Sequence, residues 1–100
     1  MPPAYWIVNA TVTDPDAYAL YRAANAAPLA AYGAEFLVRG GPQQVTEGKM
    51  HPRTVVVRFP SLQAATECYH SAAYQAAIAL RRGASTGAFC IVEGYDGPQP

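Results

Sequence analysis

The sequence predicts an α+β fold: a ferredoxin-like sandwich with an antiparallel sheet, whose elements follow one another in the order β-α-β-β-α-β. Two observations predict it. Short runs rich in β-branched and aromatic residues alternate with longer stretches of helical periodicity. The whole pattern fits within 100 residues, the length of a single domain. We expect one domain over residues 1–95 and a flexible C-terminal tail over residues 96–100.

Four segments are expected to form strands. The first and the third carry apolar side chains on both faces, as in strands that are covered on both sides. The expected strands are Tyr5–Val12, Phe36–Arg39, Thr54–Phe59 and Phe89–Tyr95. In the second strand, alternation places Arg39 on the face opposite Phe36. After the break at Gly40-Gly41-Pro42, the segment Gln43–Glu47 is a candidate to resume this strand.

Two segments are expected to form helices, namely Pro15–Tyr32 and Leu62–Arg82. Asp14 can cap the free N–H groups of the first helix, and Pro15 suits the first helical position. Pro28 lies inside this helix and is expected to kink or interrupt it. In the second segment His70-Ser71 is expected to be a joint, because a serine can cap a further helical turn.

Composition excludes several classes of function. Seven basic and seven acidic residues give a formal net charge of zero, which lends no electrostatic support to nucleic acid or acidic membranes as partners. There is no signal-peptide pattern and no apolar stretch of the roughly 20 residues that span a membrane, so a soluble, cytoplasmic protein is expected. Cys68 and Cys90 lack a CxxC spacing and are expected to be small buried apolar side chains.

One face of the expected sheet lacks a cover. Two helices cover only one face, yet the strands carry apolar side chains on both. An exposed apolar sheet is a larger patch than monomers tolerate, and two-fold self-association is the commonest way to bury one. The sequence therefore predicts a homodimer formed through the open sheet face.

Several spaced pieces of the sequence resemble one protein family. They are Phe36-Leu37-Val38-Arg39-Gly40-Gly41, Glu47-Gly48, Arg53-Thr54-Val55-Val56-Val57-Arg58-Phe59-Pro60-Ser61, Cys68-Tyr69-His70-Ser71 and Tyr74-Gln75. The chain resembles the domain of unknown function (DUF) 1330 family from Tyr5 to Gly94. The resemblance implies the dimeric α/β-barrel superfamily, in which the sheets of two ferredoxin-like protomers pack face to face. That superfamily includes antibiotic-biosynthesis monooxygenases, haem-degrading enzymes and small isomerases, but this family has no settled activity.

Two positions depart from the family's usual pattern. The family usually has Ser-Pro-Glu-Tyr where this chain has Ser71-Ala72-Ala73-Tyr74, and it often has a large aromatic residue where Cys68 stands. Any role of that glutamate is therefore absent from this chain.

The candidate ligand-binding cations are Arg39 and Arg53, which lie on or beside central strands. Arg39 precedes Gly40-Gly41, where the missing side chains allow close approach, and guanidinium forks match carboxylates and enolates. Glu47 is either a catalytic base or the ion-pair partner of Arg39 or Arg53. The sequence leaves both alternatives open.

The two histidines do not form a metal motif. His51 and His70 lack an HxH or HExxH spacing, so no metal site is expected. His51 is expected to be solvated in a hairpin loop. His70 lies at the helix joint and either transfers a proton in a pocket or bonds the backbone.

Several further polar and aromatic residues have two possible roles. Tyr5, Tyr69 and Tyr74 either line a pocket and offer hydroxyl donors, or pack in the core and interface. Asn9 either binds a substrate oxygen or ties two strands together.

Two functions from different classes remain at this point. The first is a cofactor-independent enzyme acting on a small anionic or planar organic molecule, with Arg39 or Arg53 as anchor and Glu47 or His70 as the proton-transfer group. The alternative is a non-catalytic dimer that binds a small molecule or serves a stress-related role. No cofactor is expected in either case, because the sequence has no Gly-rich dinucleotide loop and no clustered His or Cys ligands.

Overall fold

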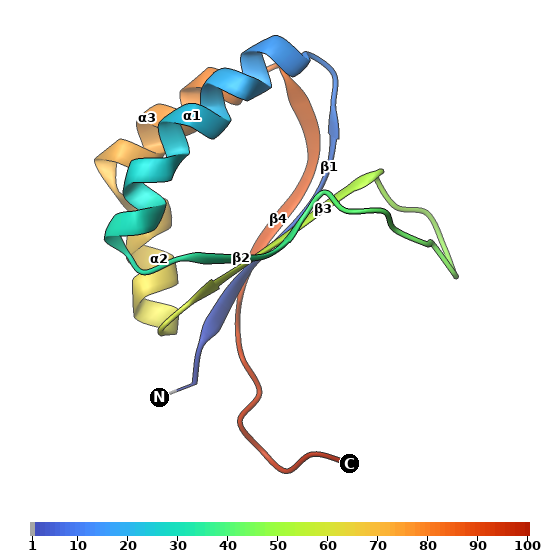
Figure 1. Ribbon diagram of the computed structural model, residues 1–100, viewed down its shortest axis with the longest axis vertical. Coiled ribbons are helices and arrows are strands. Elements are labelled where there is room, and N and C mark those ends of the chain that lie inside the picture. Colours follow the sequence, from blue (N-terminus) through green and yellow to red (C-terminus); the bar gives the residue numbers. More distant parts are fainter. Residues whose placement is uncertain (1) are drawn as a thin grey trace.

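The computed structural model describes residues 2–100 and contains a four-stranded antiparallel sheet with three helices (Figure 1). In chain order the elements are β1 (Ala4–Val12), α1 (Pro15–Ala31), β2 (Glu35–Arg39), β3 (Arg53–Phe59), α2 (Leu62–His70), α3 (Ala72–Arg81) and β4 (Ser85–Glu93). The strands lie side by side in the order β2-β3-β1-β4, and each neighbouring pair is antiparallel. The predicted fold class is confirmed, with the second helix divided in two.

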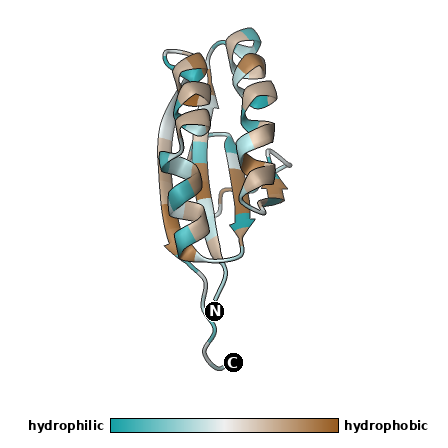
Figure 2. Ribbon diagram, turned by 90° about the vertical axis from the view of Figure 1, so that its left-hand side faces the viewer, coloured by the Kyte–Doolittle hydropathy of each residue, from teal (hydrophilic) through white to brown (hydrophobic). Residues whose placement is uncertain are grey.

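All three helices lie on one face of the sheet, and the other face is bare (Figures 1 and 2). The register sets which residues share a face: Trp6 pairs with Val57 and Ile91, and these side chains point to the helices. Ile7 pairs with Val56 and Cys90, which by alternation point to the bare face. We call this side the bare face.

Trp6 is the centre of the core between the sheet and the helices. Its side chain is 2% exposed, and its ring centroid lies 4.7 Å from those of both Phe59 and Tyr74. The ring of Phe89 lies 5.2 Å away. The indole Nε1 donates a hydrogen bond of 3.0 Å to the carbonyl of Ala65 in α2, which satisfies the one polar atom that the side chain buries. This residue therefore fastens α2 to the sheet.

Helix α1 packs along α3, and the pair spans the sheet as one layer. Asp14 caps its first turn by accepting a hydrogen bond from Ala17, as predicted. Pro28 does not interrupt the helix, contrary to the prediction, and α1 continues to Ala31. A proline removes one intrahelical donor, and here it lies within the last turn, where few later bonds depend on it.

A single serine joins α2 to α3. The hydroxyl of Ser71 donates to the carbonyl of Cys68 at 2.7 Å and accepts from the backbone N–H of Tyr74 at 3.2 Å. It thus ends one helix and caps the next, and the predicted joint is confirmed. The joint lets the chain follow the curved sheet, which one straight helix of the same length would not do.

Three further predictions about local structure were wrong. β4 begins at Ser85 instead of Phe89, because the far end of β1 needs a partner and Val12 pairs with Ser85. Residues 43–47 do not resume a strand but lie in the exposed loop between β2 and β3. Cys68 is buried as expected, but Cys90 is exposed, since it lies on the bare face.

Among the described residues, no helix has the length and hydropathy needed to cross a membrane.

The double role of Ser71 predicts the effect of its removal. Ser71→Ala deletes a hydroxyl that both accepts from Tyr74 and donates to Cys68, so we expect a loss of about 1 kcal/mol in unfolding free energy, the usual value of an N-cap. Thr66→Ala on the exposed side of α2 is the control. Chemical denaturation at equal protein concentration compares them; equal midpoints for both variants and the wild type would contradict the role of Ser71.

Candidate functional site

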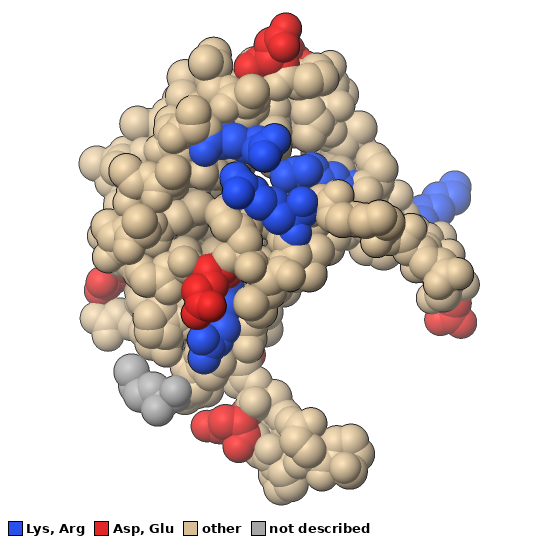
Figure 3. All heavy atoms as spheres, viewed as in Figure 1, with Lys and Arg blue, Asp and Glu red and all other residues tan. Residues whose placement is uncertain are grey.

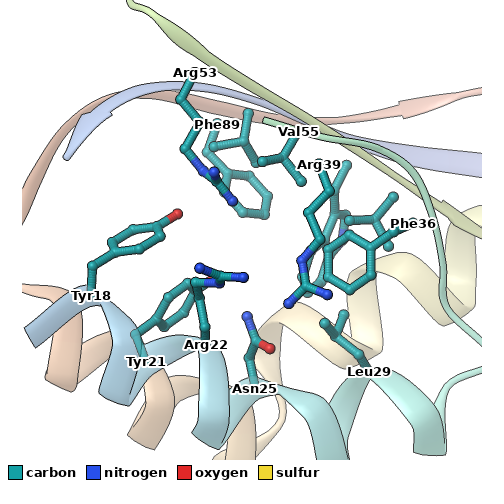
Figure 4. Close-up of a pocket in the computed structure, with 13 residues that line it drawn as sticks. Tyr18, Tyr21, Arg22, Asn25, Leu29, Phe36, Arg39, Arg53, Val55 and Phe89 are labelled. Carbon is teal, nitrogen blue, oxygen red and sulfur yellow. The ribbon is translucent and has the colours of Figure 1, made fainter. Parts of the chain in front are cut away.

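A basic cavity lies between α1 and the helix-covered face of the sheet. Its walls include the side chains of Arg22 and Asn25 from α1, Arg39 from β2 and Arg53 from β3. Figure 4 shows these four side chains pointing toward a common space, with Tyr18 and Phe36 at its sides. We call this space the arginine chamber. Its volume is about 30 Å³, room for about two water-sized groups.

The arginines of the chamber have no protein counter-ion. The one ion pair among residues 2–100 joins Arg58 to Glu35 at 3.2 Å, and it is largely exposed. No Asp, Glu or His lines the chamber. In Figure 3 basic side chains gather in the hollow between the helix layer and the strands. Several guanidinium groups facing one space repel one another, so an anion entering it gains attraction from each of them.

A β-bulge places Arg39 in the chamber. Phe36 pairs with Val57, but Val38 pairs with Val56, so the register shifts by one residue at Leu37. The shift moves Arg39 onto the helix-covered face, opposite Val55, and its guanidinium carbon lies 4.1 Å from the centroid of the Phe36 ring. The predicted arrangement, with Arg39 and Phe36 on opposite faces, was wrong because strict alternation fails at a bulge.

Arg53 is held in place by a glycine. A Cβ atom on Gly40 would overlap Nη1 of the Arg53 guanidinium, so the absence of a side chain there is what admits the arginine. Gly40 also has a φ of +71°, a conformation that other residues rarely adopt. The guanidinium carbon of Arg53 lies 5.7 Å from the centroid of the Tyr18 ring. Its Nε is buried and has no hydrogen-bond acceptor in the described part of the chain.

Asn25 is the buried polar residue of α1. Its side chain is 6% exposed, and no hydrogen bond found among residues 2–100 involves its amide. Figure 4 shows this amide pointing from the helix into the arginine chamber. An amide that faces a cavity is free to bond to a group that enters the cavity.

Two larger cavities adjoin the chamber, each of about 380 Å³. The loop-side cavity shares Tyr18, Arg22 and Arg53 with the chamber, and Pro52 and Gly40 lie on its outer wall. The β4-side cavity shares four apolar or aromatic residues with the chamber, and Arg81, Ser85 and Thr86 line its far end. A ligand with a polar head in the chamber thus has space for its body on either side of Tyr18.

A pair of tyrosine hydroxyls lies behind the chamber wall. Tyr21 lines both the chamber and the β4-side cavity, and its hydroxyl is hydrogen-bonded to that of Tyr74 at 2.5 Å. Burial, together with the neighbouring Tyr21, raises the pKa of Tyr74 far above its ordinary value. The guanidinium carbon of Arg81 lies 5.1 Å from the centroid of the Tyr21 ring. Tyr74 therefore stays protonated and fixes the position of Tyr21.

The structure brings together two of the residues singled out in the sequence, Arg39 and Arg53. Glu47 is exposed in the loop between β2 and β3 and forms no ion pair with either arginine. His70 is exposed at the end of α2, where its ring meets the edge of Tyr69 at 5.2 Å. Neither of these two proposed proton-transfer residues lines the chamber.

The remaining candidates lie elsewhere. Asn9 is on the bare face, where its amide accepts from the backbone N–H of His51 and donates to backbone carbonyls of the same loop and of Arg53. Tyr5 is half-buried on the same face. Tyr69 and Tyr74 pack around Trp6 in the core. Asn9 of β1 thus bonds to β3 and to the loop before it, which is the second of the two roles that the sequence allowed for this residue.

Sequence reasoning missed Arg22 and Asn25 as site residues. A signal was present, because Tyr18, Tyr21, Asn25 and Leu29 form the buried stripe of α1 and the polar member of that stripe is the chamber residue. Arg22 follows Tyr21 at the edge of the stripe. A polar side chain within an otherwise apolar helical stripe indicates a buried polar site, and this pattern could have identified Asn25 from the sequence.

Comparison with known proteins shows the family. The model of the family described as "Domain of unknown function (DUF1330)" matches residues 3–95. The chain belongs to this family. No curated protein matches the chain.

Solved structures of distant sequences share the fold. The RPA0582 protein of unknown function from Rhodopseudomonas palustris superposes with a TM-score of 0.75 at 14% identity, over 96% of this chain and 85% of that one. SnoaB, a cofactor-independent oxygenase from Streptomyces nogalater, superposes with a TM-score of 0.62 at 13% identity, over 100% of this chain and 97% of that one. A proposed antibiotic biosynthesis monooxygenase from Caulobacter crescentus superposes with a TM-score of 0.55 at 20% identity, over 98% of this chain and 92% of that one.

The contact between Gly40 and Arg53 predicts a difference between two neighbouring glycines. Gly40→Ala places a methyl group against the guanidinium and strains a φ of +71°, so we expect a loss of about 1 kcal/mol in stability. Gly41→Ala adds a methyl group with no atom within 4 Å and is the control. Thermal melting of both variants measures the effect, and equal melting temperatures would rule out the tight contact.

Proposed function

We propose that the protein binds a small organic anion with a planar or aromatic body, and that the arginine chamber holds the acid group. The observation that carries this proposal is the convergence of Arg22, Arg39 and Arg53 on one space that no carboxylate of the protein enters. Guanidinium forks bind carboxylates with two parallel hydrogen bonds, which gives both affinity and orientation.

Size and wall chemistry support the same class of ligand. The chamber has room for a small charged group but not for a ring, whereas each adjoining cavity, at about 380 Å³, is large enough for a ring. Aromatic side chains of Tyr18 and Phe89 lie where the chamber opens into the β4-side cavity. Planar ligands gain by stacking on such rings.

A cofactor-independent oxygenase is a second candidate function. It is favoured by the fold shared with SnoaB, a cofactor-independent oxygenase, and by the charge of the chamber. Cations that surround an enol or phenol stabilise its anion and lower its pKa, so a reaction that passes through an anion of its own substrate would be favoured here. In this proposal the substrate's proton leaves to water, directly or through the Tyr18 hydroxyl, which passes one proton on as it accepts another, since neither Glu47 nor His70 lines the chamber.

We also propose a homodimer formed through the bare face. Tyr5, Ile7, Val56 and Val92 present apolar surface there, and Val92 is 45% exposed. In Figure 1 the loop between β2 and β3 and the C-terminal segment both extend on this side of the sheet. Asn9 and Thr11 on the same face fix that loop through His51. A two-fold pairing would bury this surface from both copies.

The binding proposal is tested by removing one guanidinium. Arg53→Met keeps the length and the apolar part of the side chain, and we expect the affinity for phenylacetate or benzoate to fall at least tenfold, as for loss of a charge-assisted hydrogen bond. Arg82→Met, an exposed position after α3, is the matched control. Isothermal calorimetry measures both. Binding that is equally strong in the two variants would refute the role of the chamber.

The dimer proposal is tested by placing a charge on the bare face. Ile7→Glu should convert the dimer to a monomer in light scattering, because a carboxylate cannot be buried opposite Val56 without a partner. Leu20→Glu on α1, where the side chain is 61% exposed, should leave the dimer unchanged.

Thiol labelling gives an independent readout of the same interface. Cys90 should be unreactive in the wild type and reactive in Ile7→Glu, since the two residues pair on the bare face. Cys68 should remain unlabelled in both proteins, because it is buried and burial raises the pKa of its thiol to about 11. A wild-type protein that has a monomer mass and a reactive Cys90 would contradict the dimer.

A further inference from the structure

Asn25 differs chemically from every other charged or amide group of the chamber. The three arginines only donate hydrogen bonds, so they suit an acid group, which at neutral pH only accepts. The amide of Asn25 has both a donor and an acceptor. A hydroxyl group on the ligand can bond to either atom of this amide, because a hydroxyl also donates and accepts.

The small size of the chamber limits how far that hydroxyl can lie from the acid group. A volume of about 30 Å³ has room for small polar groups but not for a ring between them. Asn25 and the guanidinium of Arg39 approach the same space from opposite walls, the helix and the sheet (Figure 4). A hydroxyl that reaches Asn25 therefore lies close to an acid group held by Arg39, as it does when the two stand on neighbouring atoms.

We propose that Asn25 is a specificity residue that recognises a hydroxyl adjacent to the acid group, so that the ligands are 2-hydroxy acids, or the enols of 2-keto acids, with an apolar body. This inference rests on the proposed function, because it assumes that the acid group binds the arginines. Its physical basis is the position of Asn25: the residue is 6% exposed, and its amide, which has no hydrogen bond to another of residues 2–100, points into the chamber.

Two matched ligands test the inference. Mandelate and phenylacetate share a ring and a carboxylate and differ by one hydroxyl on the carbon next to the acid. We expect calorimetry to show one enantiomer of mandelate binding the wild type about tenfold more tightly than phenylacetate, the contribution of one hydrogen bond to a buried amide. In Asn25→Leu, which keeps the volume, the ratio of the two affinities should fall to about one.

Stability provides a second readout. Because Leu replaces an amide without a partner, Asn25→Leu should melt at or above the temperature of the wild type. A drop of many degrees would show that Asn25 holds the fold together, and would overturn its role in specificity.

The failures of the two proposals are distinguishable. Equal affinity of the wild type for both mandelate enantiomers and phenylacetate, or an advantage that persists in Asn25→Leu, overturns the role of Asn25 and leaves the anion-binding chamber standing. If neither acid binds the wild type at 10 mM, about 50 times the concentration that half-saturates a site of ~5 kcal/mol, both proposals fall.

Discussion

The candidate site depends on the space between helix α1 and the sheet, which the buried side chains of α1 and of the strands fill only in part. Helices α1 and α3 pack along each other, while α2 and Trp6 fasten the layer to the strands at one end. At the other end α1 spans the sheet at a distance that side chains only partly fill. The cavities lie in this space. If α1 lay closer to the strands, the arginine side chains would not fit between the helix and the sheet.

Basic residues in such a space have a cost in the empty protein. Like charges repel, and the buried Nε of Arg53 lacks an acceptor. The fold tolerates them because Arg22 and Arg39 reach water and the core lies elsewhere, around Trp6. A bound anion would remove these costs together, so the free energy of unfolding should rise as the concentration of a binding anion rises.

The sequence predicts the architecture well because the architecture depends on local signals. Strand composition, the cap at Asp14 and the serine joint at Ser71 are each readable within a few residues. Arg39 and Arg53, which the sequence singles out as ligand-binding candidates, line one cavity, but the face predicted for Arg39 was wrong. Its face is set by a bulge whose cause lies in the pairing with β3.

The rest of the site could not be predicted from the sequence, because it depends on contacts between segments that are distant along the chain. Glu47 and His70 have the right chemistry but lie on exposed parts of the loop and of α2. The alternatives for Asn9 were separable only by its contact with the loop at His51. Which polar residues share a cavity is decided by how far α1 stands from the sheet, and no single segment encodes that distance. The most direct test is therefore a crystal structure of the protein soaked in 4-bromomandelate. We expect a carboxylate held by the arginines of the chamber and an anomalous bromine peak in one adjoining cavity. An empty chamber with the bromine peak on the bare face would contradict the proposed binding site.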